Sequence, residues 1–326
     1  MMLRYIKNFL PVLVLLLLTI ARVQSLKGAI TLLAWNLDKA ASRNVAIYEK
    51  FYKPMRNETV DIIIFHEACS EESQVKLQAM TPDMPIIYIN VKDHFMKWKE
   101  RMAMLSGPNP LCPGSKLSQR FKLGYKLMCW FWYKRFLDYL PVDYAWMLRI
   151  DDDVEVLDGF RNPETWSYDW QSPVKIASTT WLQFPTNVTS TPEGIFEAGM
   201  NEMTRELLIE RKRDFTWTDS GNFYLAPYTN VMYLDINWWR RQLLVREFAN
   251  RVEESNCIII SRWGDLELWG YNTYIGETKP YLLPFPYSHK SHKCMAKNQY
   301  TSNQGSREQY ACIPHKANLE LPLAWG

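Results

Sequence analysis

Apolar runs of strand length alternate with helical segments through the N-terminal third of the chain. The strand-type runs lie at 29–35, 61–68 and 85–91, and apolar residues with helical spacing lie between them at 43–56 and 70–80. This order of strands and helices predicts a parallel sheet with helices on both faces. Such sheets bind ligands beyond the carboxyl ends of their strands, which indicates where a functional site would lie.

The rest of the chain extends this α/β pattern and then becomes mixed. A largely buried helix is predicted at 120–140 and a buried strand at 144–150. Ser70 and Asn237 are expected to cap the helices that follow them. No repeat or linker interrupts residues 28–326, so we expect one compact catalytic unit. The later elements are expected as strands at 174–184, 230–236 and 281–287 and as helices at 193–213, 237–255 and 262–276.

Three adjacent carboxylates, Asp151, Asp152 and Asp153, follow the predicted strand at 144–150. Like charges repel, so nothing in folding favours such a run. In an extended chain Asp151 and Asp153 would share one face, and Asp152 would point away. Carboxylate oxygens suit hard ions such as Mn²⁺ or Mg²⁺, which neutralise the diphosphate of a nucleotide sugar. The D-x-D pattern therefore predicts a metal site of the kind used by sugar-nucleotide-dependent transferases, with an acidic surface turn as the alternative.

Two later segments add candidate site residues. His289 and His292, in "SHKSHKC", are either polar loop residues or a metal ligand supplied by the far end of the chain. "RWGD" contains Arg262 and Asp265 and is either part of the site or a helix N-terminus with an arginine pair. The spacing of these residues leaves both alternatives open.

The N-terminal segment has the features of a targeting sequence. A short basic region precedes an apolar run at 9–21 that is short for a membrane span. We therefore expect residues 1–27 to be a signal peptide or a type II signal anchor rather than a buried helix. Sequons at Asn57 and Asn187 agree with a luminal chain. The chain is accordingly expected in the secretory pathway, held at a membrane or secreted if the segment is cleaved.

Composition argues against other classes of protein. The net charge of +3 comes without a basic block, so nucleic acid is not an expected partner. The aromatic content of 14% indicates a large aromatic core, with sugar-stacking walls as the alternative. The six cysteines lack CxxC spacing, so zinc is not expected, and an oxidising lumen would let some of them pair. Many pairings are open; Cys294 with Cys312 is the one we expect, and Cys129 is expected to be a buried thiol.

Three blocks of sequence carry a resemblance to a known family. They are "GYKLMCWFWYKRFLDYLPVDYAWMLRIDDDV", "TNVMYLDINWWRR" with "SRWGDLE", and "PYSHKSHKC". In order and approximate spacing they resemble the fungal KRE2/MNT1/KTR family of α-1,2-mannosyltransferases, glycosyltransferase family 15. The resemblance implies a type II Golgi membrane enzyme with the GT-A fold, a Rossmann-type nucleotide-sugar-binding fold. It also implies GDP-mannose as donor, a protein-linked glycan or glycoprotein as acceptor, Mn²⁺ (or Mg²⁺) as cofactor, and retention of anomeric configuration.

The resemblance further implies roles for residues at matching positions. Among the donor-binding residues, Lys126 and Arg149 would offset phosphate charge, and Asp151 would contact the metal or the donor ribose. Of the two catalytic residues, Tyr125 would lie near the reacting centre, and Asp265 would orient the acceptor hydroxyl. The positions are Asp153 and His289 for the metal, Asn36, Lys126, Arg149 and Asp151 for the donor, and Tyr125 and Asp265 for catalysis.

Two positions depart from the family pattern. Trp35 stands where the family has an arginine beside the nucleotide, and Met232 stands where it has a glutamate near the anomeric carbon. A thioether cannot replace that carboxylate as a base or nucleophile, and strand alternation would turn Asp235 to the other face. Either transfer needs no enzyme nucleophile, with the acceptor attacking from the leaving-group face, or the chain is a catalytically silent glycan- or nucleotide-binding relative. The remaining alternatives for the function are a glycosyltransferase that uses a different nucleotide sugar and a secreted metal-dependent hydrolase of a phosphoester.

Overall fold

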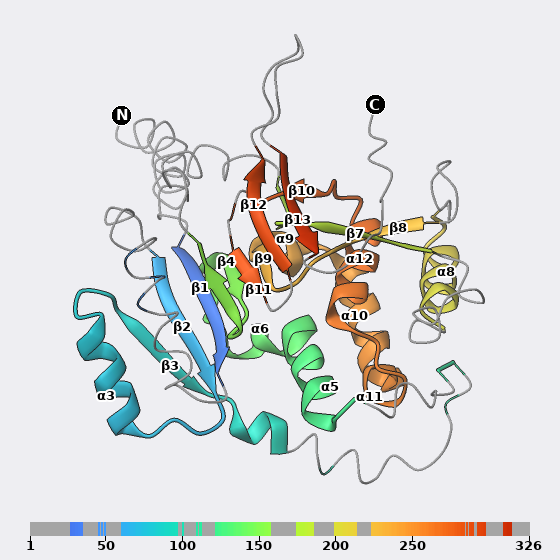
Figure 1. Ribbon diagram of the computed structural model, residues 1–326. Coiled ribbons are helices and arrows are strands. Elements are labelled where there is room, and N and C mark those ends of the chain that lie inside the picture. Colours follow the sequence, from blue (N-terminus) through green and yellow to red (C-terminus); the bar gives the residue numbers. More distant parts are fainter. Residues whose placement is uncertain are drawn as a thin grey trace, which may run out of the picture.

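Figure 1 shows the computed structural model of the chain. The predicted N-terminal segment at 1–27 lies almost wholly outside the described residues, as do Asn36, Trp35 and both sequons. Of the helix predicted at 43–56, only scattered residues are described. In the part of the chain that is described, no helix is long and apolar enough to cross a membrane. The described residues are 27–34, 45, 47, 49, 60–96, 100, 109, 111–112, 121–157, 174–185, 199–213, 223–283, 285, 287–289, 292–297 and 309–314.

A seven-stranded sheet forms the centre of the molecule, in the order β10-β6-β9-β4-β1-β2-β3 (Figure 1). Neighbouring strands are parallel except where β9 pairs with β4 and with β6. The prediction of a mostly parallel α/β sheet is therefore confirmed. The strands are β1 (Lys27–Ala34), β2 (Val60–His66), β3 (Ile86–Asn90), β4 (Tyr144–Ile150), β6 (Ile176–Ser178), β9 (Val231–Asp235) and β10 (Tyr281–Leu282).

The two faces of this sheet are buried by different elements. Apolar side chains of the first face pack with a set of helices into one large core. On the second face, Leu77 of α3 (Glu71–Met80) and residues of a small antiparallel sheet complete another core. The helices of the first face are α5 (Leu123–Trp130), α6 (Phe136–Tyr139), α8 (Met200–Glu210), α9 (Ile236–Arg241), α10 (Leu243–Ser255), α11 (Cys257–Ile260) and α12 (Asp265–Ile275).

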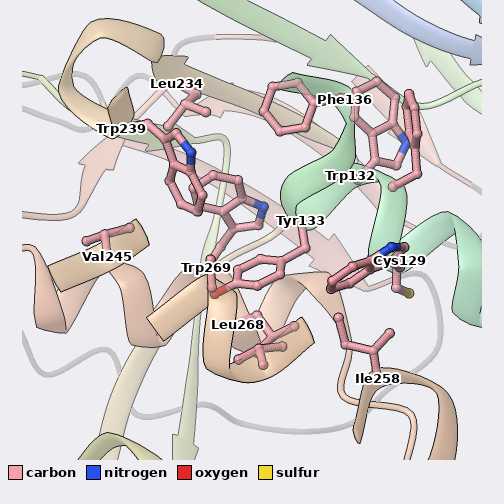
Figure 2. Packing of buried hydrophobic residues seen from close by; sticks show 14 of the residues in the cluster. Cys129, Trp132, Tyr133, Phe136, Leu234, Trp239, Val245, Ile258, Leu268 and Trp269 are labelled. Carbon is pink, nitrogen blue, oxygen red and sulfur yellow. The ribbon is translucent and has the colours of Figure 1, made fainter. Parts of the chain in front are cut away.

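Aromatic rings fill the core between the first face and its helices (Figure 2). Tyr133 and Trp269 meet edge to face with ring centroids 5.9 Å apart, and Trp239 lies 4.8 Å from Trp269. Ring pairs of this kind add about 0.5–1.5 kcal/mol each beyond the burial of their surface. For these residues the expectation of a large aromatic core is confirmed.

The long helix predicted at 120–140 forms, but it is not α-helical throughout. A π-helical turn, η3 (Phe131–Arg135), separates α5 from α6. π turns widen the helix locally and are often found at functional sites. This one contributes Trp132, whose ring lies against a charged residue of the site described below.

Of the two predicted helix caps, Ser70 is confirmed and Asn237 is not. Ser70 caps α3 as expected, because its hydroxyl accepts a hydrogen bond from the backbone N–H of Ser73 at 3.2 Å. Asn237 is not a cap, and this prediction is wrong. The cap is Asp235, whose carboxylate accepts from the backbone N–H of Trp238 at 2.7 Å. The predicted helix at 237–255 also divides into α9 and α10, with a break between them.

Two predicted strands are each divided between different sheets. The run at 174–184 becomes β6, in the central sheet, and β7 (Trp181–Pro185), which pairs with β8 (Phe223–Pro227). The run at 281–287 becomes β10, also in the central sheet, and the first residue of another strand. That strand belongs to an antiparallel sheet in the order β13-β12-β11-β5. Its strands are β5 (Val154–Val156), β11 (Tyr287–His289), β12 (His292–Lys297) and β13 (Gln309–Pro314).

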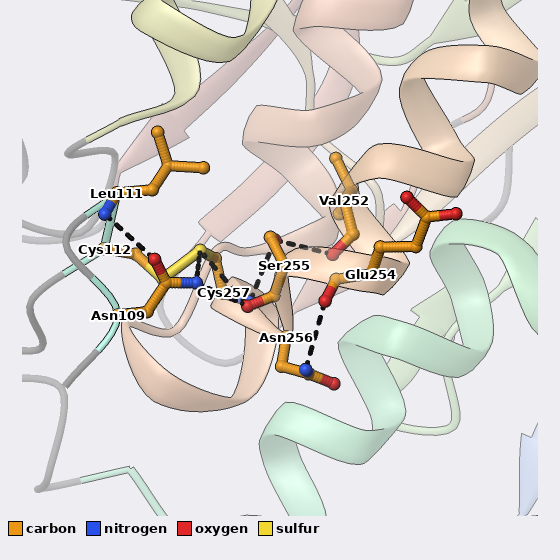
Figure 3. The surroundings of a disulfide bond; sticks show 8 residues. All are labelled: Asn109, Leu111, Cys112, Val252, Glu254, Ser255, Asn256 and Cys257. Carbon is orange, nitrogen blue, oxygen red and sulfur yellow. Dashed lines mark hydrogen bonds between the residues drawn. A yellow bond between two sulfur atoms is a disulfide. The ribbon is translucent and has the colours of Figure 1, made fainter. Parts of the chain in front are cut away.

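A disulfide joins Cys112 to Cys257, at the start of α11 (Figure 3). Next to it, the side-chain amide of Asn109 donates to the backbone carbonyl of Ser255 at 2.8 Å. Cys129 is a buried thiol, as predicted. Cys294 and Cys312, which are expected to form a disulfide, lie directly opposite each other in the ladder of β12 and β13. Their side chains lie outside the described part of the structure, so this disulfide stays a prediction.

Removal of this disulfide is expected to lower the free energy of unfolding by about 2–4 kcal/mol. The two cysteines are 145 residues apart, so the bond restricts a long loop of the unfolded chain. The variant is the double substitution Cys112→Ser and Cys257→Ser, measured by denaturant unfolding. Cys69→Ser is the control, because Cys69 takes no part in a disulfide. Equal stability of the double variant and the control would contradict the prediction.

Candidate functional site

The three aspartates form a tight turn at the carboxyl end of β4. The backbone N–H of Val154 donates to the carbonyl of Asp151 at 3.2 Å, which closes the turn before β5 begins. The prediction of an extended chain at this point is therefore wrong. Asp151 and Asp153 have different hydrogen-bond partners, Arg149 and His289 respectively. The location of the site at the carboxyl edge of the parallel strands agrees with the rule for α/β sheets.

Arg149, in β4, connects two carboxylates of the site. Its Nε donates to Oδ1 of Asp151 at 2.8 Å, and its Nη1 donates to Oδ2 of Asp265. The guanidinium carbon also lies 4.7 Å from the ring centroid of Trp132, and Arg149 is only 1% exposed. A buried cation between two carboxylates and an aromatic face is held firmly, since each charge is compensated in a region that excludes water.

Asp151 receives further support from Asn230, the turn residue directly before β9. Its Oδ2 accepts from the side-chain amide of Asn230 at 3.2 Å, and its backbone N–H donates to the carbonyl of Asn230 at 2.8 Å. Burial raises the pKa of the Asp151 carboxyl to about 6, although Arg149 acts in the opposite direction. Asn230 was not among the predicted site residues, but it lies in the "TNVM" part of a block that carries the family resemblance.

Asp153 faces His289, which comes from β11. The pairing of β11 with β5 places His289 opposite Val154, the residue after Asp153. Nε2 of His289 lies 3.0 Å from Oδ2 of Asp153, and Nδ1 lies 3.3 Å from the hydroxyl of Tyr228. The structure thus brings together the two predicted metal ligands across 136 positions of sequence. His289 is a buried strand residue, so the alternative of a polar loop residue is wrong.

The residues present fit a hard divalent ion. Among the described residues, no group of three or more His, Cys, Asp or Glu side chains is arranged to hold a metal. One carboxylate and one imidazole nevertheless suit Mg²⁺ or Mn²⁺, because such ions commonly take only one or two protein ligands and complete their shell with phosphate oxygens and water. Asp153 and His289 would be those ligands.

Tyr228 has the position of an outer partner for the histidine. A neutral His289 that binds a metal through Nε2 carries its proton on Nδ1, and that N–H would donate to the Tyr228 hydroxyl. Nothing in the sequence pattern identified this tyrosine. Tyr228→Phe is expected to weaken Mn²⁺ binding about 10-fold, the lower end of what outer partners contribute. Titration of Mn²⁺ monitored by electron paramagnetic resonance measures this; unchanged affinity would exclude the role.

Tyr125 and Lys126, at the start of α5, differ in exposure. Tyr125 is 37% exposed, and its hydroxyl accepts from Nη2 of Arg262 at 3.1 Å. Lys126 is 8% exposed, and its Nζ donates to the backbone carbonyl of Ile259 at 2.6 Å. Burial, followed by the charge of Arg262, lowers the pKa of the Lys126 ammonium. The roles implied for both residues remain predictions.

Met232 lies directly opposite Arg149 in the pairing of β9 with β4. It is fully buried within the core of the first face of the sheet. Asp235 alternates to the other side of β9, as predicted, and is engaged by the helix cap and by Lys175 at 2.9 Å. The position of the family's glutamate is therefore occupied by a buried apolar side chain, and Asp235 does not replace the missing carboxylate.

The mostly parallel central sheet with its flanking helices is a fold of the GT-A class. Two solved structures of fungal mannosyltransferases share this fold. Core-mannan synthase A (CmsA/Ktr4) from Aspergillus fumigatus, in its Mn/GDP form, superimposes with a TM-score of 0.61 at 17% sequence identity, over 82% of this chain and 75% of that one. Ktr4p from S. cerevisiae in complex with GDP gives 0.58 at 14% identity, over 90% and 77%. No family model and no curated protein matches the sequence.

Proposed function

We propose that the chain is a metal-dependent glycosyltransferase of the secretory pathway that transfers mannose from GDP-mannose to protein-linked glycans. The observation that carries this proposal is the Asp153–His289 pair at the carboxyl edge of a GT-A sheet. The solved structures with this fold include mannosyltransferases with Mn and GDP or with GDP. An ion held by the pair would neutralise the diphosphate of the donor and stabilise its departure.

The groups around this pair suit transfer without a covalent enzyme intermediate. The buried thioether of Met232 cannot serve as the nucleophile, and the carboxylate of Asp265 accepts a hydrogen bond from Arg149. In the reaction we propose, the acceptor hydroxyl forms its bond to the anomeric carbon on the face from which the diphosphate leaves. The proton of that hydroxyl passes to the departing diphosphate. This course retains the anomeric configuration, and an α-1,2 linkage belongs to the same proposal.

The cellular setting of the proposal depends on residues 1–27, which would hold the enzyme at the Golgi membrane as a type II protein. If the segment were cleaved, the enzyme would be secreted. A comparison of the mass of the mature protein with that of the full chain of 326 residues distinguishes the two outcomes.

The test is a panel of nucleotide sugars offered to the purified luminal chain with and without Mn²⁺ or Mg²⁺. Transfer from GDP-mannose that requires the ion is the expected result. Transfer from a UDP-sugar would keep the class of reaction and change the donor. Release of inorganic phosphate from simple esters, without sugar transfer, would instead indicate a hydrolase and overturn the proposal.

A catalytically silent glycan- or nucleotide-binding protein is the second candidate. It is favoured by Met232, a buried thioether opposite Arg149 at the position where the resembled family has a glutamate. This candidate predicts that the chain binds nucleotide or glycan and turns over none of the donors in the panel. Turnover of any donor would exclude it.

A further inference from the structure

Arg262 lies in the short connection between α11 and α12 and has an unusual backbone conformation. Its φ is +59°, in the left-handed region that residues with a side chain seldom adopt. Such a conformation costs roughly 1–2 kcal/mol, so its surroundings must hold it in place. The next residue, Trp263, is fully buried, and Asp265 is bonded to Arg149. The connection therefore presents Arg262 in one fixed direction.

The guanidinium of Arg262 lies against the aromatic rings at the start of α5. Its carbon is 4.2 Å from the ring centroid of Phe121 and 5.3 Å from that of Tyr125. Its Nη2 donates to the Tyr125 hydroxyl at 3.1 Å, and its Nη1 is 4.0 Å from a carboxylate oxygen of Glu267. The side chain of Arg262 is 16% exposed.

The two cations that the sequence predicted for phosphate binding are engaged within the protein. Arg149 is enclosed by two carboxylates and a tryptophan ring. Lys126 is bonded to the carbonyl of Ile259, and burial lowers the pKa of its ammonium. Arg262 interacts electrostatically with Lys126 and with Tyr125, so it belongs to the same part of the site. Arg262 differs from Lys126 in having a planar donor fork, and 16% of its side chain is exposed.

We propose that Arg262, together with the hydroxyl of Tyr125, binds the diphosphate of the nucleotide donor and holds the nucleoside diphosphate as it leaves. The inference rests on the proposed function and deepens it by naming the residue that receives the leaving group. A guanidinium suits this task because its fixed fork matches the spacing of phosphate oxygens. The rings of Phe121 and Tyr125 fix the plane of the fork before the donor arrives.

The test compares nucleotide binding to wild type and to Arg262→Asn, measured by isothermal titration calorimetry in the presence of Mn²⁺. Asparagine tolerates the left-handed conformation better than other residues with a side chain, so this variant removes the cation without adding backbone strain. GDP affinity is expected to fall at least about 10-fold, as for the loss of a charge-assisted hydrogen bond. The affinity for GMP, which lacks the second phosphate, is expected to change less. Arg262→Lys keeps the charge without the fork and is expected to be intermediate.

Two controls keep the result interpretable. Arg211→Asn removes an exposed arginine of the helix α8 region, which pairs with Glu247, and is expected to leave GDP affinity unchanged. Thermal unfolding of each variant shows whether it is folded. If wild type binds GDP and Arg262→Asn binds it equally well, the inference fails and the proposed function stands. If wild type binds neither GDP nor UDP, the proposed function fails, and the inference fails with it.

Discussion

Replacement of Arg149 by methionine is expected to lower the free energy of unfolding by about 3–5 kcal/mol. The substitution keeps most of the side-chain volume and removes the cation that Asp151 and Asp265 share. The two carboxylates would then lie close together, buried and uncompensated. Denaturant unfolding at neutral pH measures the loss. Arg251→Met is the matched control, because Arg251 pairs with carboxylates at the surface, where an ion pair contributes at most about 1 kcal/mol.

The effect of Arg149→Met should also depend on pH. In wild type the pKa of Asp151 is raised by burial to about 6, above its value of about 3.9 in an unfolded chain. The folded state therefore binds this proton more tightly, and the carboxyl makes the protein less stable as the pH rises from about 4 to about 6. Without Arg149 the pKa of Asp151 would rise further. The difference in stability between variant and wild type should accordingly be smaller at pH 5 than at pH 7.5; a constant difference would show that lost packing, not charge, is responsible.

Asp153→Ala is expected to reduce kcat/KM for sugar transfer on the order of 1000-fold while leaving the unfolding temperature nearly unchanged. The carboxylate is one of two protein ligands in the proposed metal site, and charge stabilisation by such an ion contributes several kcal/mol. The side chain is partly exposed, so its removal leaves no large cavity. Steady-state transfer and thermal unfolding, measured on the same preparation, provide the two readouts.

The control for Asp153→Ala is Asp152→Ala, which removes a carboxylate from the same turn and leaves the Asp153–His289 pair intact. This control is expected to keep most of the transfer activity. If Asp153→Ala retained full activity with the same dependence on Mn²⁺, the assignment of Asp153 as a metal ligand would be wrong. Equal losses in both variants would indicate that the acidic turn acts only through its overall charge.

The parts of the fold that the sequence predicted are those with a strong local pattern. Strand β4 was predicted with its observed limits, because a largely apolar run, interrupted only by Arg149, ends at three aspartates and leaves little alternative. The run at 174–184 was predicted as one strand, because periodicity is the same for one long strand and for two short ones. The division into β6 and β7 depends on the sheets on either side, and those partners are distant in the sequence.

The same distinction applies to the candidate site. Asp153 and His289 were predicted as a pair through the family resemblance, and the structure places them 3.0 Å apart. The link from Arg149 to Asp265 was not predicted, because it joins residues 116 positions apart and no local rule connects them. Tyr228 escaped detection for the same reason, since its contact with His289 joins residues 61 positions apart.

The register of β5 and β11 has a consequence for how this molecule could change. The proposed ion-holding pair lies beside one rung of an antiparallel ladder, because His289 is opposite Val154 and Asp153 is the residue before Val154. A shift of one residue in that ladder would turn His289 to the other face and dismantle the pair. The ion-holding pair therefore depends on the backbone register of two strands, although its two members lie 136 positions apart in the chain.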